Sequence, residues 1–73
     1  MKKGDRVKMT QECKDTLKRN GCNDHVHEFG NCVGIVQEQV RGPNGDVWPE
    51  WDVRWQPSNL RYAYHPASLV IVG

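Results

Sequence analysis

The chain has 73 residues, of which 37% are hydrophobic and 26% charged, and its formal net charge is +1 at pH 7. A chain of this length is near the size at which one hydrophobic core only just offsets the entropy of ordering it, so we expect a single small domain over residues 1–73. Three Trp, two Tyr and one Phe supply large apolar side chains, which argues against disorder. The basic start, residues 1–6, is not followed by an apolar run, which excludes a signal peptide or membrane segment there and favours the cytoplasm.

The first elements are a strand and a short helix. Residues 5–9 alternate between polar and apolar side chains, which predicts a half-buried strand. Thr10 follows, and its hydroxyl can accept hydrogen bonds from the free amides at the start of a helix. Good helix formers fill residues 11–19, and Asn20-Gly21 suits the left-handed conformation at a helix end. We therefore predict a helix over 11–19.

A polar, histidine-rich segment over residues 22–31 is predicted to be a loop. Residues 32–36 are mostly apolar and predict a second strand, which can continue to Val40. Gly34 inside it indicates a bulge or a bend. Strong turn formers over residues 41–46 then separate this strand from the next.

The clearest pattern in the chain is a hairpin made of residues 51–55, a turn over 56–59 and a second run over 60–64. Strict alternation in the first run is typical of a half-buried strand, and a turn with proline, serine and asparagine favours antiparallel pairing of the two runs. The alternation directs the following rings into the core: Trp51, Trp55 and Tyr62.

The chain ends with a tight turn near Pro66 and an apolar strand over residues 69–72. The elements together number five short strands, with a helix inserted after the first. We therefore predict a mainly β fold, a five-stranded, partly open small barrel.

A set of short motifs is spread over nearly the whole chain. The motifs are Gly4-Asp5-Arg6-Val7, Gly30, Val33-Gly34-Ile35-Val36, Val53-Arg54-Trp55, Arg61-Tyr62 and Leu69-Val70-Ile71-Val72. Together they resemble the signature of Src-homology-3-like (SH3-like) barrels. The set most resembles the Mind bomb/HERC-type domain of ubiquitin ligases, and small uncharacterised bacterial and phage proteins carry a similar pattern. The resemblance implies the fold; barrels of this class bind peptides, nucleic acids or other subunits without sharing one site.

The aromatic content predicts a protein-binding surface. The chain holds more large rings than one small core can bury, so some of them should lie at the surface, where they can dock an extended peptide. We therefore predict a non-enzymatic interaction module that uses these rings, nearby arginines and the segment over residues 20–31. The predicted partner-binding residues are Trp48, Tyr64, His65, Arg54 and Arg61.

Nucleic-acid binding is the alternative function. Residues 1–20 hold seven Lys and Arg against three acids, whereas the remainder of the chain has an acidic surplus. A basic flank of this kind can contact phosphate, although it is also what an ordinary solvated surface looks like. The predicted nucleic-acid residues are Lys2, Lys3, Arg6, Lys8, Lys14, Lys18 and Arg19.

Three cysteines, an odd number, favour free thiols or metal ligands over a disulfide framework. Cys22 and His25 have a spacing that lets two side chains reach one tetrahedral zinc ion, and two further cysteines can complete the set. No cofactor is otherwise predicted. The other interpretation is that two cysteines fill the core and the histidines are exposed. The candidate zinc ligands are Cys13, Cys22, His25 and Cys32.

Catalytic chemistry is not predicted. A nucleophilic Cys22 beside His25 or His27 would need a positioned base and an oxyanion site, and a surface loop supplies neither. Glu50 and Asp52 lie on one face of a strand, where they are expected to pair with arginines across the hairpin.

Overall fold

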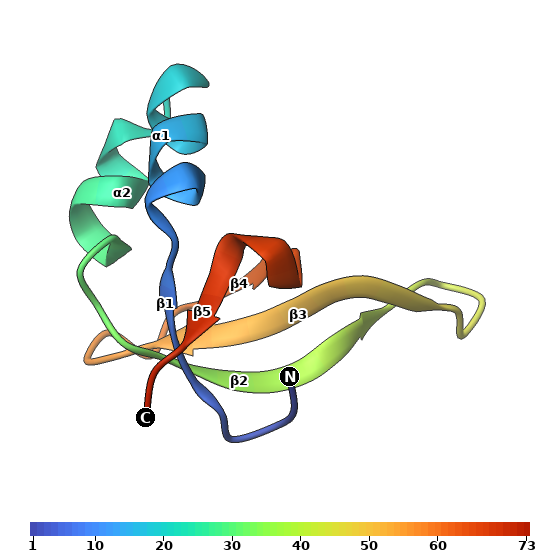
Figure 1. Ribbon diagram of the computed structural model, residues 1–73. Helices are drawn as coiled ribbons and strands as arrows, with labels where there is room; N and C mark the ends of the chain where they lie inside the picture. Colours follow the sequence, from blue (N-terminus) through green and yellow to red (C-terminus); the bar gives the residue numbers. More distant parts are fainter.

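The computed structural model describes residues 1–73 and is mainly β, with one antiparallel sheet and two short helices (Figure 1). This confirms the predicted mainly β fold with five strands. The elements in chain order are β1 (Arg6–Met9), α1 (Gln11–Arg19), α2 (Asn23–Phe29), β2 (Gly34–Arg41), β3 (Val47–Trp55), β4 (Arg61–Tyr64), the 3-10 turn η1 (Pro66–Ser68) and β5 (Leu69–Ile71).

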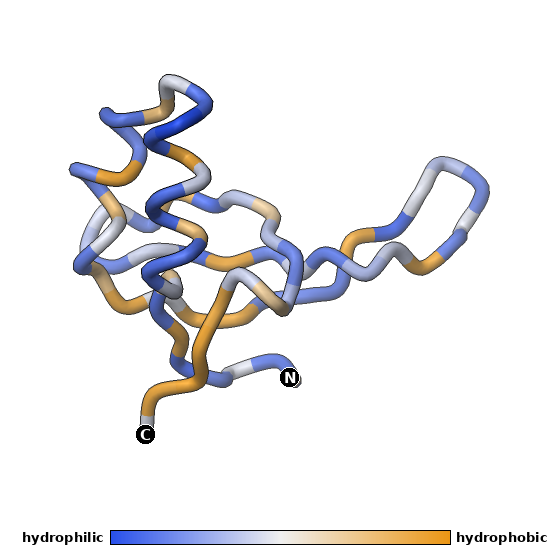
Figure 2. The backbone as a smooth tube through the Cα atoms, turned by 45° about the horizontal axis from the view of Figure 1, so that its top comes forward, coloured by the Kyte–Doolittle hydropathy of each residue, from blue (hydrophilic) through white to orange (hydrophobic).

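The five strands form a single sheet in the order β4-β3-β2-β1-β5. The first four are consecutive neighbours, and the last strand returns to pair with the first, Val7 lying opposite Ile71. β4 and β5 do not pair with each other, so the sheet has two open edges and the strands do not form a closed barrel. β5 is hydrophobic along its length (Figure 2), with Leu69 buried and Val70 and Ile71 exposed.

α1 has the bounds that the sequence predicts. The Thr10 hydroxyl accepts a hydrogen bond from the Cys13 N–H at 3.0 Å, which satisfies one of the free amides at the helix start. Cys13 is buried in the core, and Leu17, one turn later, packs against it from the same face. The helix therefore covers the core with one stripe and presents its charged residues to solvent.

The predicted loop over residues 22–31 was wrong, because seven of its residues form α2. Val26 and Phe29 are three residues apart, so they share a helix face, and both are buried. Gly21, at a φ of +82°, lets the chain turn back between the two helices. No side chain caps α2 at Cys22, which removes the usual sequence signal for a helix start.

The core lies between the inner face of the sheet and the two helices. Its most deeply buried side chains come from four separate elements: Val7, Phe29, Val36, Val53 and Trp55. No helix in the structure is both long enough and apolar enough to cross a bilayer.

The β3–β4 hairpin has the antiparallel pairing that the alternation predicts, with Trp51 opposite Tyr64 and Val53 opposite Tyr62. Trp55 is fully buried and Trp51 packs against the core at its rim. The placement of Tyr62 in the core was wrong: its side chain remains 41% exposed, although it contacts His25 and Phe29 of α2.

Candidate functional site

The hairpin between β2 and β3 projects from the body of the molecule (Figure 1), and we call its residues 38–50 the arm. β1 pairs with β2 only near Ile35, and β4 pairs with β3 only from Trp51 to Arg54. Beyond these points, β2 and β3 pair only with each other. The arm is therefore a two-stranded ribbon with both edges open.

Two irregularities interrupt the pairing within the arm. The register shifts between Val36 and Gln39 and again between Gln39 and Arg41. Pro49 lies inside β3 in this region and has no N–H to donate to a neighbouring strand. Bulges and proline turn strand edges away from further pairing, so the arm is better suited to contacts through its side chains than to strand addition.

Trp48 is the largest exposed side chain of the arm. Its exposed fraction is 47%, and its indole lies over Gly42, the first residue after β2, so close that a Cβ there would be 2.7 Å from Nε1. One part of the ring thus rests on backbone while the rest faces solvent. Val47, next to it, is 54% exposed. The sequence analysis predicted Trp48 as a binding residue but missed Val47, because the strand was predicted to begin only at Trp51, after both residues.

Tyr64 was predicted at the surface, and the structure contradicts this, because the side chain is only 8% exposed and belongs to the core. Its hydroxyl oxygen accepts a hydrogen bond from Nε1 of Trp55 at 3.0 Å. The hydroxyl hydrogen is then free to donate to Nε2 of His25. Burial, opposed by the hydrogen bond from Trp55, raises the pKa of Tyr64 well above its ordinary value, so the hydroxyl stays protonated. Tyr64 is a structural residue that joins β3, β4 and α2.

The other predicted partner-binding residues do not gather around Trp48. His65 is exposed beside η1, where its Nδ1 accepts a hydrogen bond from the Ala67 N–H. Arg54 and Arg61 lie directly opposite each other on β3 and β4. Trp48 and Arg54 are six residues apart on one strand, a separation of about 20 Å. The five predicted residues therefore occupy three separate places on the surface and one in the core. The surface places are Trp48, His65 and the Arg54–Arg61 pair, and the buried residue is Tyr64.

Arg61 donates a hydrogen bond to the carboxylate of Asp52 at 2.7 Å across the hairpin. This pairing was predicted for Asp52. The same prediction for Glu50 was wrong, because Glu50 forms no ion pair and one of its carboxylate oxygens is buried without a hydrogen-bond partner. The pair formed by Asp52 and Arg61 leaves Arg54 with no ion-pair partner.

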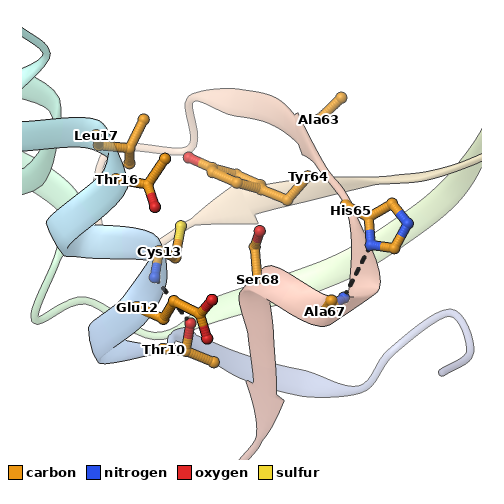
Figure 3. A pocket seen from close by; sticks show the side chains of 10 residues that line it. All are labelled: Thr10, Glu12, Cys13, Thr16, Leu17, Ala63, Tyr64, His65, Ala67 and Ser68. Carbon is orange, nitrogen blue, oxygen red and sulfur yellow. Dashed lines mark hydrogen bonds between the residues drawn. The ribbon is translucent and has the colours of Figure 1, made fainter. Parts of the chain in front are cut away.

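A groove of about 350 Å³ lies between α1, β4 and η1. Figure 3 shows Cys13, Tyr64 and Ser68 facing into it. Burial raises the pKa of the Cys13 thiol, so this thiol is kept in its protonated, weakly nucleophilic form. A hydrogen bond with the Ser68 side chain opposes this shift, so the thiol and the Ser68 and Tyr64 hydroxyl groups of the groove are paired within the protein.

The predicted nucleic-acid residues are divided among three places. Lys2 and Lys3 precede β1, at the end of the molecule away from the helices (Figure 1). Lys14 and Lys18 line a cleft between the two helices, together with His27. The structure therefore does not unite the seven residues in one surface; Arg6 and Lys8 lie on β1, and Arg19 ends α1.

The predicted zinc ligands are not brought together, because no three metal-binding side chains of the chain gather at one point. Cys13 is in the core, and Cys22 is exposed at the start of α2. His25 points inward to Tyr64, and the Cys32 thiol donates to the Glu28 carbonyl oxygen at 3.2 Å. The helix that replaces the predicted loop separates these side chains.

The partly buried position of His25 can be tested through the pH dependence of protein stability. Burial lowers its pKa below the ordinary value of 6.5, although Glu28 opposes the shift. The unfolded chain therefore takes up the proton at higher pH than the folded protein does. The His25 contribution to stability is fully present above about pH 6.5 and declines as the pH falls through that value toward the lower folded-state pKa.

We expect the urea concentration at the unfolding midpoint to decrease when the pH is lowered from about 7.5 to about 5.5. The decrease should be smaller in His25→Gln, because glutamine does not titrate yet can accept the Tyr64 hydrogen bond. His27→Gln on the exposed face of α2 is the matched control. Equal pH dependence in all three proteins would contradict the role of His25.

Comparison with protein-family models, with curated proteins and with solved structures finds no match for this chain.

Proposed function

We propose that this protein is a non-enzymatic interaction module that binds a partner protein through the arm, with Trp48 as the central contact. The observation that carries the proposal is the indole of Trp48, which is 47% exposed on a ribbon with both edges open. Val47 precedes it in the strand, is 54% exposed and projects to the opposite side of the ribbon. Exposed aromatic residues are enriched at protein interfaces. A two-stranded ribbon is itself only marginally stable in water, so a partner that covers these residues also stabilises the arm.

Tryptophan is the residue type in which binding energy at protein interfaces is most often concentrated, because its large ring fills a pocket at low entropic cost. The exposed charges of the arm are two carboxylates, Glu38 and Asp46, and one arginine, whereas Glu50 is half-buried with one carboxylate oxygen out of contact with solvent, so the exposed rim is slightly acidic. We therefore propose a partner with an apolar cleft for the indole and basic groups around it. The charged residues of the arm are Glu38, Arg41, Asp46 and Glu50.

We also propose that the sheet is an open variant of the SH3-like architecture. Support comes from the five antiparallel strands and from the 3-10 turn immediately before the last strand. In this arrangement the five-stranded sheet anchors the base of the arm.

The test compares proteins retained from a nuclease-treated lysate by immobilised wild-type protein, Trp48→Ala and Leu60→Ala. Leu60 is the matched control, because it is 45% exposed but lies in the β3–β4 turn, away from the arm. Removing a central indole costs about 2 kcal/mol or more, which is about 30-fold in affinity. We expect a partner that Leu60→Ala retains and Trp48→Ala loses.

Equal retention by all three proteins would contradict the assignment of Trp48. Loss of every retained protein after nuclease treatment, compared with an untreated lysate, would show that the contacts run through nucleic acid and would contradict a direct protein partner.

A further inference from the structure

Three arginines lie in one row across the sheet. Arg6 on β1 is directly opposite Ile35 on β2, Ile35 is opposite Arg54 on β3, and Arg54 is opposite Arg61 on β4. Residues directly opposite each other in a sheet project to the same face. The row therefore presents three guanidinium groups on one face, over about 15 Å at the usual spacing between strands.

This face points away from the core. The next row along the strands, Val7, Gly34 and Trp55, projects to the other side and is buried. The three arginines themselves are exposed. We call this side the outer face; it also carries Lys8, two residues after Arg6 and opposite the exposed Val70.

The charges on the outer face are not balanced. On the outer face, the ion pair is formed by the Asp52 carboxylate with Arg61. Arg6, Lys8 and Arg54 form no ion pair. The register also places Arg54 directly opposite Arg61, and Asp52 balances only one of these two like charges. The stability of the domain does not explain this excess of positive charge. An anionic ligand bound to the outer face would reduce the repulsion between these side chains.

We propose that the outer face binds the sugar-phosphate backbone of duplex nucleic acid through Arg6, Lys8, Arg54 and Arg61. The guanidinium group binds phosphate through two parallel hydrogen bonds, and a row of such groups matches a polymer with regularly repeated phosphates. The site is separate from the arm. Arg6 and Lys8 come from the predicted nucleic-acid residues, and Arg54 and Arg61 come from the predicted partner-binding residues. The register of the strands places these four residues on one face.

The uncharged side chains of this face favour a duplex over a single strand. Ile35 and Val70 are aliphatic, and no ring lies in the arginine row. Single strands are usually held by stacking their bases on aromatic side chains, which this row does not offer. A duplex keeps its bases stacked on each other and presents phosphates outward, so contacts of this kind position it without reading its sequence.

The experiment measures fluorescence anisotropy of a labelled duplex DNA of about 20 base pairs, titrated with protein at several salt concentrations between 50 and 200 mM, the range over which phosphate contacts change affinity strongly. The test variant is the double substitution Arg6→Gln and Arg54→Gln. The matched control is Lys14→Gln and Lys18→Gln, which removes the same charge from the cleft between the helices. Thermal unfolding of both variants is recorded alongside.

We expect the test variant to reduce the slope of log K against log salt by about 2, because two phosphate contacts are lost, and the control to leave the slope near the wild-type value. The test variant should unfold at the wild-type temperature or above it, since Arg54 no longer faces Arg61. An equal change in slope for the control would overturn the proposal in favour of diffuse charge attraction. Tighter binding of a polyglutamate peptide than of the duplex at the same salt would also overturn it, in favour of an acidic protein.

Discussion

Replacing Phe29 by alanine is expected to lower the free energy of unfolding by about 3–5 kcal/mol, the usual cost of removing a buried phenylalanine. The side chain is 2% exposed and stacks on Trp55, with ring centroids 6.0 Å apart. It also contacts His25 and Tyr62 at ring distances of 4.9 and 5.3 Å. A domain of this size has a total stability of roughly 4–11 kcal/mol, so the substitution removes a large part of that stability.

Urea denaturation followed by far-UV circular dichroism measures this effect. Glu28→Ala is the matched control, because Glu28 is the exposed neighbour of Phe29 on α2 and its substitution should change stability by no more than about 0.5 kcal/mol. If Phe29→Ala were as stable as the control, α2 would not be part of the core.

Gly34→Ala is expected to lower the free energy of unfolding by about 3 kcal/mol, at the upper end of the cost of overpacking. A Cβ at this position would be 2.3 Å from Cγ1 of Val53 and 3.0 Å from Cε3 of Trp55. Both side chains are fully buried in a densely packed core, so neither has space into which it can move. Glycine is therefore needed at residue 34 for the close approach of β3.

A double-mutant cycle with Val53→Ala separates this cause from a general weakening of the strand. Removing the Val53 methyl groups opens the space that the new Cβ requires, so the double variant should be less destabilised than the sum of the two single variants, by about 1 kcal/mol or more. Strictly additive effects would contradict the steric explanation.

The parts of the fold that the sequence predicted correctly depend on local patterns. α1 was predictable because Thr10 supplies a cap and Cys13 and Leu17 define one face. The β3–β4 hairpin was predictable because its alternation is strict. α2 was not, because it has no side-chain cap and only Val26 and Phe29 signal its buried face among polar neighbours.

The depth of each ring could not be predicted, because it depends on the neighbouring elements. Tyr62 and Tyr64 have the same parity on β4, yet Tyr64 alone is deeply buried, since its hydroxyl meets Trp55 and the unpredicted α2. The same helix explains why the predicted zinc ligands lie apart, since that prediction assumed a loop that could fold around an ion.

The candidate binding surfaces depend on long-range pairing. An excess of rings indicated that Trp48 is exposed, but the arm exists only because β1 and β4 stop pairing near Ile35 and Trp51. The arginine row requires the register of four strands, which no local pattern contains.

Site-specific photo-crosslinking tests the proposed role of the arm most directly. A benzophenone amino acid is placed at Val47, beside Trp48, and in a second protein at the exposed Leu60, and each is irradiated in a nuclease-treated lysate. A partner that binds the arm should form a covalent adduct from position 47 and not from position 60, and Trp48→Ala should abolish the adduct. An adduct formed only from position 60, or one that persists in Trp48→Ala, would contradict binding through the arm.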